Sequence, residues 1–214
     1  MELIWFAVGN RDAIAGMALE HITIVGVAVG LAILTGVPLG IAITQNRRIA
    51  DVVLYAASII VTVPSIALFG LMIPILSTIG HGIGWLPAVI AILLYSQLPI
   101  VRNTYTAITN VDPALREAAR GMGMTPLQRM WRVELPIAVP VIMAGVRTAV
   151  VMNIGVAAIA AYIGAGGLGV LISRGISQTD PRQLIIGALA VSLLAIVADR
   201  ALYRVQKLLT PAGL

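Results

Sequence analysis

Three glycines, Gly164, Gly166 and Gly169, reproduce the G-x-G-x-x-G spacing of turns that bind the pyrophosphate of a dinucleotide. Asp180 follows, in the region where a ribose-binding carboxylate would be sought. Such a site needs a strand before the glycines and a helix after them. Residues 135–163, which precede the glycines, are an apolar stretch too long for a strand and long enough for a membrane helix. We therefore reject a nucleotide site and predict a tight turn or a close helix contact.

The other groups that could carry chemistry are too few or wrongly spaced for catalysis. The chain has no cysteine, and its two histidines, His21 and His81, are far apart, so no thiol site or histidine metal cluster is predicted. No G-x-S-x-G or H-E-x-x-H segment occurs. The single lysine, Lys207, lacks the context of a phosphate-binding loop. We expect no catalytic residue, metal site or cofactor in this chain, so that any ATP would be hydrolysed by a partner.

The composition is typical of an integral membrane protein. Hydrophobic residues make up 59% of the 214 residues and charged residues make up 11%, whereas a soluble domain has about 25% charged residues. The net charge of +5 could indicate a nucleic-acid partner, but the basic residues fall between apolar segments rather than on one polar face. We therefore expect no nucleic-acid partner and a lipid bilayer as the surroundings.

Five apolar segments are long enough to cross a bilayer, which takes about 20 helical residues. They cover residues 21–44, 52–79, 83–101, 135–163 and 183–203. Because lipid offers the backbone no hydrogen-bond partner, each is predicted to be a helix. The expected fold is all-α, with a peripheral helix over residues 1–20 and one transmembrane domain over residues 21–210.

The second segment, residues 52–79, is longer than a crossing requires and contains Pro64 and Pro74. Proline removes a backbone donor and clashes with the preceding turn, so we predict a kink at Pro64 and Ser65 and an irregular exit near Pro74. A broken helix at membrane depth survives where protein or a cavity covers it. Pro64 and Ser65 are therefore candidates for the wall of a solute pathway, and a kink that serves packing alone is the alternative.

Basic residues between the segments predict the orientation, because cytoplasmic loops are enriched in them. Ten lie on one side and three on the other: Arg47, Arg48, Arg102, Arg116, Arg120, Arg129, Arg132, Arg200, Arg204 and Lys207 against Arg11, Arg174 and Arg182. The first side is predicted to be cytoplasmic, which places the N-terminus outside and the C-terminus inside. The glycine turn then lies at the outer mouth, where Gly166 and Gly167 could form part of a gate or a simple packing turn.

A few polar residues within the predicted spans are further candidates for a pathway. Arg147 is the only charged residue well inside a span, and intramembrane charges are functional candidates. It could line a pathway, pair across an interface between two chains, or serve structure alone, since arginine can reach toward the interface. Tyr95 and Asn153 are also candidates, although polar residues between membrane helices often only hydrogen-bond to one another.

The connection between the third and fourth segments, residues 112–136, contains two helix starts. Asp112 can cap a helix with Pro113 in its first turn, and the glycines that follow can end it. Thr125 and Gln128 match a capping box for a second helix. Both short helices would be amphipathic and marginal alone. We expect another protein to cover part of their apolar faces.

The segment EAARGMGMTPLQRMWRVELP in this connection resembles the EAA loop of ABC-importer permeases. That pattern is Glu-Ala-Ala, three residues, Gly, nine residues, Ile, one residue and Leu-Pro, and this chain departs from it only by valine in place of isoleucine. The matching residues are Glu117, Ala118, Ala119, Gly123, Val133, Leu135 and Pro136. The resemblance implies that they belong to a coupling helix that docks on ATP-hydrolysing subunits.

Further stretches resemble the osmoprotectant branch of these permeases, which imports quaternary amines such as glycine betaine, choline and carnitine. They are VPS, LPIVRNTYTAI, LPIAVPVIMAGVRTAVV and AAYIGAGGLGVLI. The resemblance implies a pair of permease chains in the bacterial cytoplasmic membrane, two ATPase subunits that hold ATP and Mg²⁺, and an extracytoplasmic substrate-binding protein. A permease for amino acids such as methionine, an intramembrane enzyme and a passive channel are the alternatives.

Overall fold

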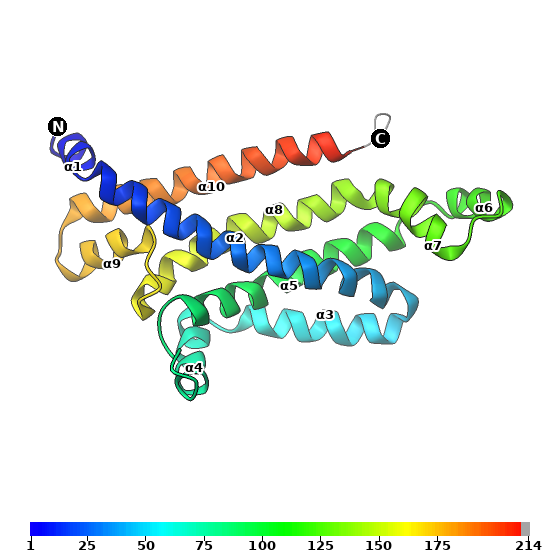
Figure 1. Ribbon diagram of the computed structural model, residues 1–214, viewed down its shortest axis with the longest axis horizontal. Coiled ribbons are helices and arrows are strands. Elements are labelled where there is room, and N and C mark those ends of the chain that lie inside the picture. Colours follow the sequence, from blue (N-terminus) through cyan, green and yellow to red (C-terminus); the bar gives the residue numbers. More distant parts are fainter. Residues whose placement is uncertain (211–214) are drawn as a thin grey trace.

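The computed structural model describes residues 1–210 as a bundle of helices (Figure 1). The long helices are α2 (Arg11–Ala42), α3 (Arg47–Thr62), α5 (Trp85–Thr109), α8 (Leu135–Ile159) and α10 (Pro181–Leu209). The short ones are α1 (Glu2–Gly9), η1 (Ile43–Gln45), α4 (Ser65–Ser77), α6 (Pro113–Gly121), α7 (Pro126–Arg129), η2 (Met130–Glu134), η3 (Ala160–Ile163) and α9 (Gly169–Ser177). Residues 1–210 contain no strand, and the all-α prediction is confirmed.

Four helical stretches are long and apolar enough to cross a membrane. They are Arg11–Gln45, Trp85–Thr109, Pro126–Ile163 and Pro181–Leu209. The pair formed by α3 and α4 meets the same criteria when the two helices are taken together. The four to five candidate spans agree with the five apolar segments of the sequence, because a helix is the form that satisfies the backbone inside lipid.

The first long helix, α2, begins at Arg11 rather than at His21. Residues 11–20 are rich in good helix formers such as alanine and contain no proline, so nothing stops the helix over this stretch. Asn10 separates α2 from α1, which lies beside the start of α10. The helix that contains the first predicted span, residues 21–44, therefore begins ten residues before that span.

The helices α3 and α4 meet at an angle of 98°. Val63 between them is extended, with φ −69° and ψ 127°, which is the conformation that a following proline favours. The predicted kink at Pro64 and Ser65 is confirmed, and it is sharp enough to divide the segment into two helices. By contrast, α4 continues through Pro74 to Ser77. The predicted irregular exit at Pro74 is wrong, because membrane helices tolerate a proline whose freed backbone group is satisfied locally.

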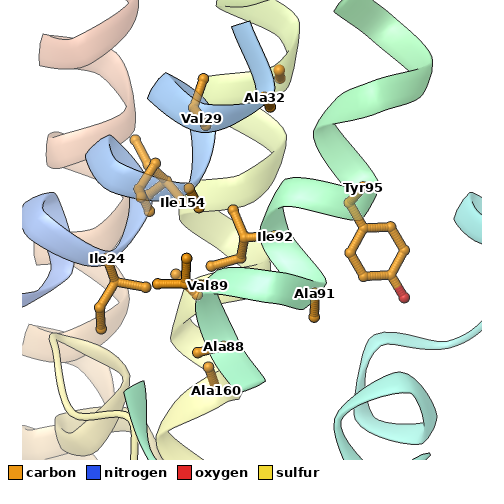
Figure 2. Packing of buried hydrophobic residues seen from close by; sticks show 14 of the residues in the cluster. Ile24, Val29, Ala32, Ala88, Val89, Ala91, Ile92, Tyr95, Ile154 and Ala160 are labelled. Carbon is orange, nitrogen blue, oxygen red and sulfur yellow. The ribbon is translucent and has the colours of Figure 1, made fainter. Parts of the chain in front are cut away.

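Buried side chains of α2, α5 and α8 form the centre of the bundle, and Figure 2 shows Val29, Ile92 and Ile154 of these three helices gathered together. Small residues bring the helices close: a methyl group added to Gly145 of α8 would lie 2.6 Å from the carbonyl oxygen of Pro99 in α5. The last helix, α10, is different, since only 6% of its most apolar stretch is buried. Its Val191, Leu194, Ala195 and Ala198 are partly buried where they pack against this centre.

The two ends of the bundle carry different structures (Figure 1). One end holds α6, α7, the connection from α2 to α3 and the end of α10. The opposite end holds α1, α9 and the start of α10. The end with α6 and α7 is the one that the distribution of basic residues predicts to be cytoplasmic.

Candidate functional site

The segment of residues 112–136, which we call the coupling hairpin, begins as the sequence predicts. The Asp112 carboxylate accepts a hydrogen bond of 2.8 Å from the backbone N–H of Ala114 and so caps α6. The helix ends at Gly121, and Gly123 takes φ +77°, a left-handed conformation that glycine adopts without strain. The first predicted helix and its glycine turn are confirmed.

The second half of the coupling hairpin starts at a complete capping box. The Thr125 hydroxyl accepts the backbone N–H of Gln128 at 3.3 Å, and the Gln128 side chain accepts the N–H of Thr125 at 2.9 Å. After α7 the chain runs through a π-helical turn, η2, directly into α8. The helical stretch Pro126–Ile163 therefore joins the coupling hairpin to a candidate membrane span.

Large apolar side chains are exposed on the surface of the coupling hairpin. The exposed fractions are 45% for Leu115, 69% for Met122, 69% for Leu127 and 62% for Trp131. Among the residues of the EAA pattern, Glu117, Ala118 and Gly123 are exposed, Ala119 is buried, and Val133, Leu135 and Pro136 are half-buried. Exposed apolar patches rimmed by polar residues are typical of protein–protein contact sites.

The structure also reveals a buried carboxylate that sequence reasoning missed. Glu134, which is 3% exposed, fills the unspecified position between Val133 and Leu135 of the EAA pattern. Its two oxygens lie 2.6 Å from Nε of Arg129 and 3.6 Å from Nη2 of Arg116. The sequence offered one signal for such a contact: an acidic residue five positions after Arg129, in a loop that is rich in arginine.

The glycine turn joins η3 to α9 at the end opposite the coupling hairpin. Gly164, Gly166 and Gly167 all have positive φ, between 77° and 83°. The N–H of Gly167 donates a hydrogen bond of 3.0 Å to the Glu20 carboxylate of α2. A helix rather than a strand precedes the turn, so the dinucleotide spacing is a coincidence of sequence.

Asp180, the residue that a dinucleotide site would have used, caps α10 by accepting the backbone N–H of Arg182 at 3.0 Å. Hydrogen bonds from the side chains of Arg182 and Gln183 lower the pKa of this half-buried carboxyl group to about 2. The Asp180 carboxylate is therefore a structural group at the start of the last helix.

The break between α3 and α4 is held by a tyrosine. The Tyr95 hydroxyl donates a hydrogen bond of 2.6 Å to the carbonyl oxygen of Val63, the residue before Pro64. Figure 2 shows the Tyr95 ring projecting from α5 away from the other labelled core residues. The structure therefore brings together three of the predicted pathway residues, Pro64, Ser65 and Tyr95.

The other predicted pathway residues lie apart and have partners within the chain. Asn153 is fully buried, and its amide donates to the Ser96 hydroxyl at 2.8 Å and to the Ala149 carbonyl at 2.9 Å. Arg147 donates two hydrogen bonds to the Asp199 carboxylate of α10, at 3.0 Å and 2.8 Å. These residues do not converge on one site with the glycine turn in the described structure.

The comparisons with known proteins identify relatives along the whole chain. The family model described as "Binding-protein-dependent transport system inner membrane component" matches residues 14–211. The chain is 58% identical over 214 residues to the osmoprotectant import permease protein OsmW of Salmonella typhimurium, with 100% of both chains covered. It is 43% identical over 212 residues to the choline transport system permease protein OpuBB of Bacillus subtilis, covering 99% of this chain and 95% of that one.

Solved structures with the same fold are also transporters. The MetNI methionine ABC transporter, inward facing, aligns with a TM-score of 0.81 over 92% of this chain and 96% of that chain, at 24% identity. An amino acid ABC transporter with histidines aligns with a TM-score of 0.77 over 95% of this chain and 97% of that one, at 20% identity. These identities establish the fold alone. The family model and the permease relatives show that the chain belongs to the binding-protein-dependent transport system inner membrane components, a family of transport permeases rather than enzymes.

Proposed function

We propose that this chain is the membrane-spanning subunit of an ATP-driven importer that takes up osmoprotectants such as glycine betaine, choline or carnitine. The proposal of substrate class rests on relatives named for osmoprotectant import and choline transport that match the chain over nearly its full length. The chain itself is poor in aromatic residues, at 5%. Because quaternary ammonium groups bind best to aromatic faces, solute recognition is assigned to a separate extracytoplasmic binding protein.

The observation that carries the docking proposal is the exposed apolar face of the coupling hairpin. Leu115, Met122, Leu127 and Trp131 are all at least 45% exposed on a segment that begins with two well-capped helices. A groove of an ATPase subunit, which holds ATP and Mg²⁺, would cover this face. The exposed Glu117 would meet charges at the rim of that groove. Two permease chains and two ATPase subunits complete the proposed assembly.

The proposed mechanism is alternating access. ATP draws the ATPase subunits together and displaces the coupling hairpin, and the continuous helix from Pro126 to Ile163 carries the displacement into the bundle. The bundle opens outward to accept solute, and hydrolysis resets it. The coupling hairpin must bind the two ATPase states with different affinities, because a partner that binds both states equally shifts no equilibrium.

The proposed orientation has the coupling hairpin and the C-terminus in the cytoplasm and the N-terminus outside, in the bacterial cytoplasmic membrane. The chain has no native cysteine, so single cysteines at the exposed positions Arg48 and Gln178 report the sidedness. In intact cells, a membrane-impermeant maleimide should label position 178 and spare position 48. The reverse pattern would contradict this orientation.

The function is tested by uptake into proteoliposomes that contain the permease with its ATPase and binding protein. We expect ATP-dependent uptake of at least one of radiolabelled glycine betaine, choline and carnitine, with ATP hydrolysis stimulated by the same solute. Radiolabelled methionine serves as the comparison, because the MetNI structure shares the fold. Uptake of methionine but of none of the three osmoprotectants would contradict the proposed substrate class. Solute flux in the absence of ATP would indicate a channel.

A further inference from the structure

Helix α6 of the coupling hairpin buries little apolar surface. Ala119 is the one buried residue among the nine residues of α6. A hollow of about 640 Å³ separates part of the hairpin from the ends of α2 and η1, with Ile41 and Thr44 on its wall. Because apolar burial contributes little, polar contacts must set the orientation of α6 relative to the membrane spans.

The Glu134 carboxylate supplies those contacts. It stands at the last position of η2, immediately before α8, and its side chain is 4% exposed. One oxygen pairs with Arg129 of α7 at 2.6 Å, and the other pairs with Arg116 of α6 at 3.6 Å. The single carboxylate therefore links both helices of the coupling hairpin to the first turn of α8.

Arg116 extends this link to a second span. Its guanidinium also donates a hydrogen bond to the carbonyl oxygen of Ile108, in the last turn of α5. Cations are favourable at the C-terminal end of a helix, where carbonyl groups lack intrahelical donors. The chain of contacts Ile108–Arg116–Glu134 thus connects α5, α6 and the start of α8.

Burial strengthens the ion pairs that Glu134 makes with Arg116 and Arg129. Exposed ion pairs are worth little because water and salt screen them, but the carboxylate here is almost fully covered. Removing it would leave the guanidinium groups of Arg116 and Arg129, which are 29% and 17% exposed, without the acid that pairs with both. Helix α6 would then keep the hydrogen bond from Arg116 to Ile108 but lose its ion pair to the start of α8.

We propose that Glu134 is a positioning residue for energy coupling: its carboxylate fixes the coupling hairpin to α5 and α8 so that displacement of the hairpin moves both spans. This inference rests on the proposed docking of the hairpin on an ATPase. Glu117, which lies on α6 and is exposed, is assigned to the partner surface. The two glutamates of the segment thus have separate roles: Glu117 faces the ATPase subunit and Glu134 faces the membrane spans.

A distance measurement on the full-length permease in lipid nanodiscs tests the positioning role without an ATPase. The chain has no cysteine, so spin labels go to cysteines introduced at two exposed positions, Met122 at the end of α6 and Val141 in α8. We expect one narrow distance in the otherwise wild-type chain, loss of that narrow distance in Glu134→Gln, and its retention in Glu134→Asp. The matched control Glu117→Gln should also retain it.

Uptake per ATP hydrolysed tests the coupling role in the assembled importer. In Glu134→Gln we expect the ATPase to co-purify and hydrolyse ATP, while the ratio of uptake to hydrolysis falls about fivefold or more, as in a loss of coupling between sites. Glu134→Asp should restore most of the ratio. An unchanged distance in Glu134→Gln overturns the proposal, and so does an unchanged ratio. If the wild-type chain fails to bind an ATPase, the docking function fails instead, and the distance measurement still decides the positioning role.

Discussion

The pair of Arg147 and Asp199 gives the most direct prediction about what holds the exposed helix α10 in place. Arg147 makes two hydrogen bonds to the Asp199 carboxylate and one of 3.0 Å to the Gln206 side chain. Its guanidinium also lies 5.1 Å from the centre of the Tyr203 ring. All three partners lie on α10, so replacing Asp199 by leucine removes the charge partner and leaves the arginine among weaker contacts.

The magnitude follows from the exposure of the pair. Breaking a fully buried ion pair by removing one partner costs about 3–5 kcal/mol. Here the side chains of Arg147 and Asp199 are 24% and 34% exposed, so screening reduces the cost, and we expect Asp199→Leu to lower the free energy of unfolding by about 2 kcal/mol. In the double variant that combines Asp199→Leu with Arg147→Leu, neither charge is left without its partner. The free energy of unfolding should then fall by about 1 kcal/mol or less.

Equilibrium unfolding in mixed micelles, followed by circular dichroism, measures these differences, and the double-mutant cycle isolates the pair. Asp12→Asn is the control, because the pair of Arg11 and Asp12 is 77% and 96% exposed and should contribute nothing measurable. If the double variant is as unstable as Asp199→Leu, the reasoning is refuted. We also expect the double variant to keep solute uptake; loss of uptake at normal stability would instead assign Arg147 to the pathway.

Other perturbations test the remaining parts of the structure. Tyr95→Phe removes the donor to the carbonyl at the helix break and should cost about 1 kcal/mol of unfolding free energy, measured in the same micelles; a neutral result would mean that water satisfies that carbonyl. Gly145→Ala should destabilise by about 1–3 kcal/mol through overpacking against a backbone carbonyl of α5, whereas Gly155→Ala, which meets no atom within 4 Å, should be nearly neutral. Replacing Glu117 by tryptophan, or Gly123 by valine, should reduce ATPase co-purification and uptake with membrane insertion intact, and normal uptake in both would contradict docking through the coupling hairpin.

Features that depend on neighbours within one helical turn were predictable from the sequence. The Asp112 cap and the capping box of Thr125 and Gln128 use side chains and backbone groups at most three residues apart. The break at Pro64 follows from the missing backbone donor of that one residue. Long apolar runs likewise required helices, since the bilayer leaves the backbone no other partner.

Features that depend on distant segments were not predictable in the same way. Arg147 and Asp199 are far apart in sequence, and nothing local to either shows that α8 and α10 place them in contact. The π-helical turn at η2 changes which face of the helix each following residue occupies, and the apolar pattern of the segment did not indicate it. Glu134 occupies a position that the EAA pattern leaves unspecified, although the structure makes it the most buried charged residue of the coupling hairpin.

The partners of the intramembrane polar residues bear on where solute could pass. The pathway candidates Tyr95, Asn153 and Arg147 stand alone as polar residues in apolar segments, yet each hydrogen-bonds within the chain. A group already bonded must lose that partner before it can bind solute, and an unmade buried hydrogen bond costs about 1–3 kcal/mol. Asn153 is the informative case, because its amide oxygen has no hydrogen-bond partner among residues 1–210 while its side chain is fully buried. Solute could reach that oxygen only if the packed helices around it moved, and the close contact of Gly145 in α8 with Pro99 in α5 shows how tightly two of them pack. The geometry of one chain therefore favours structural roles for these residues.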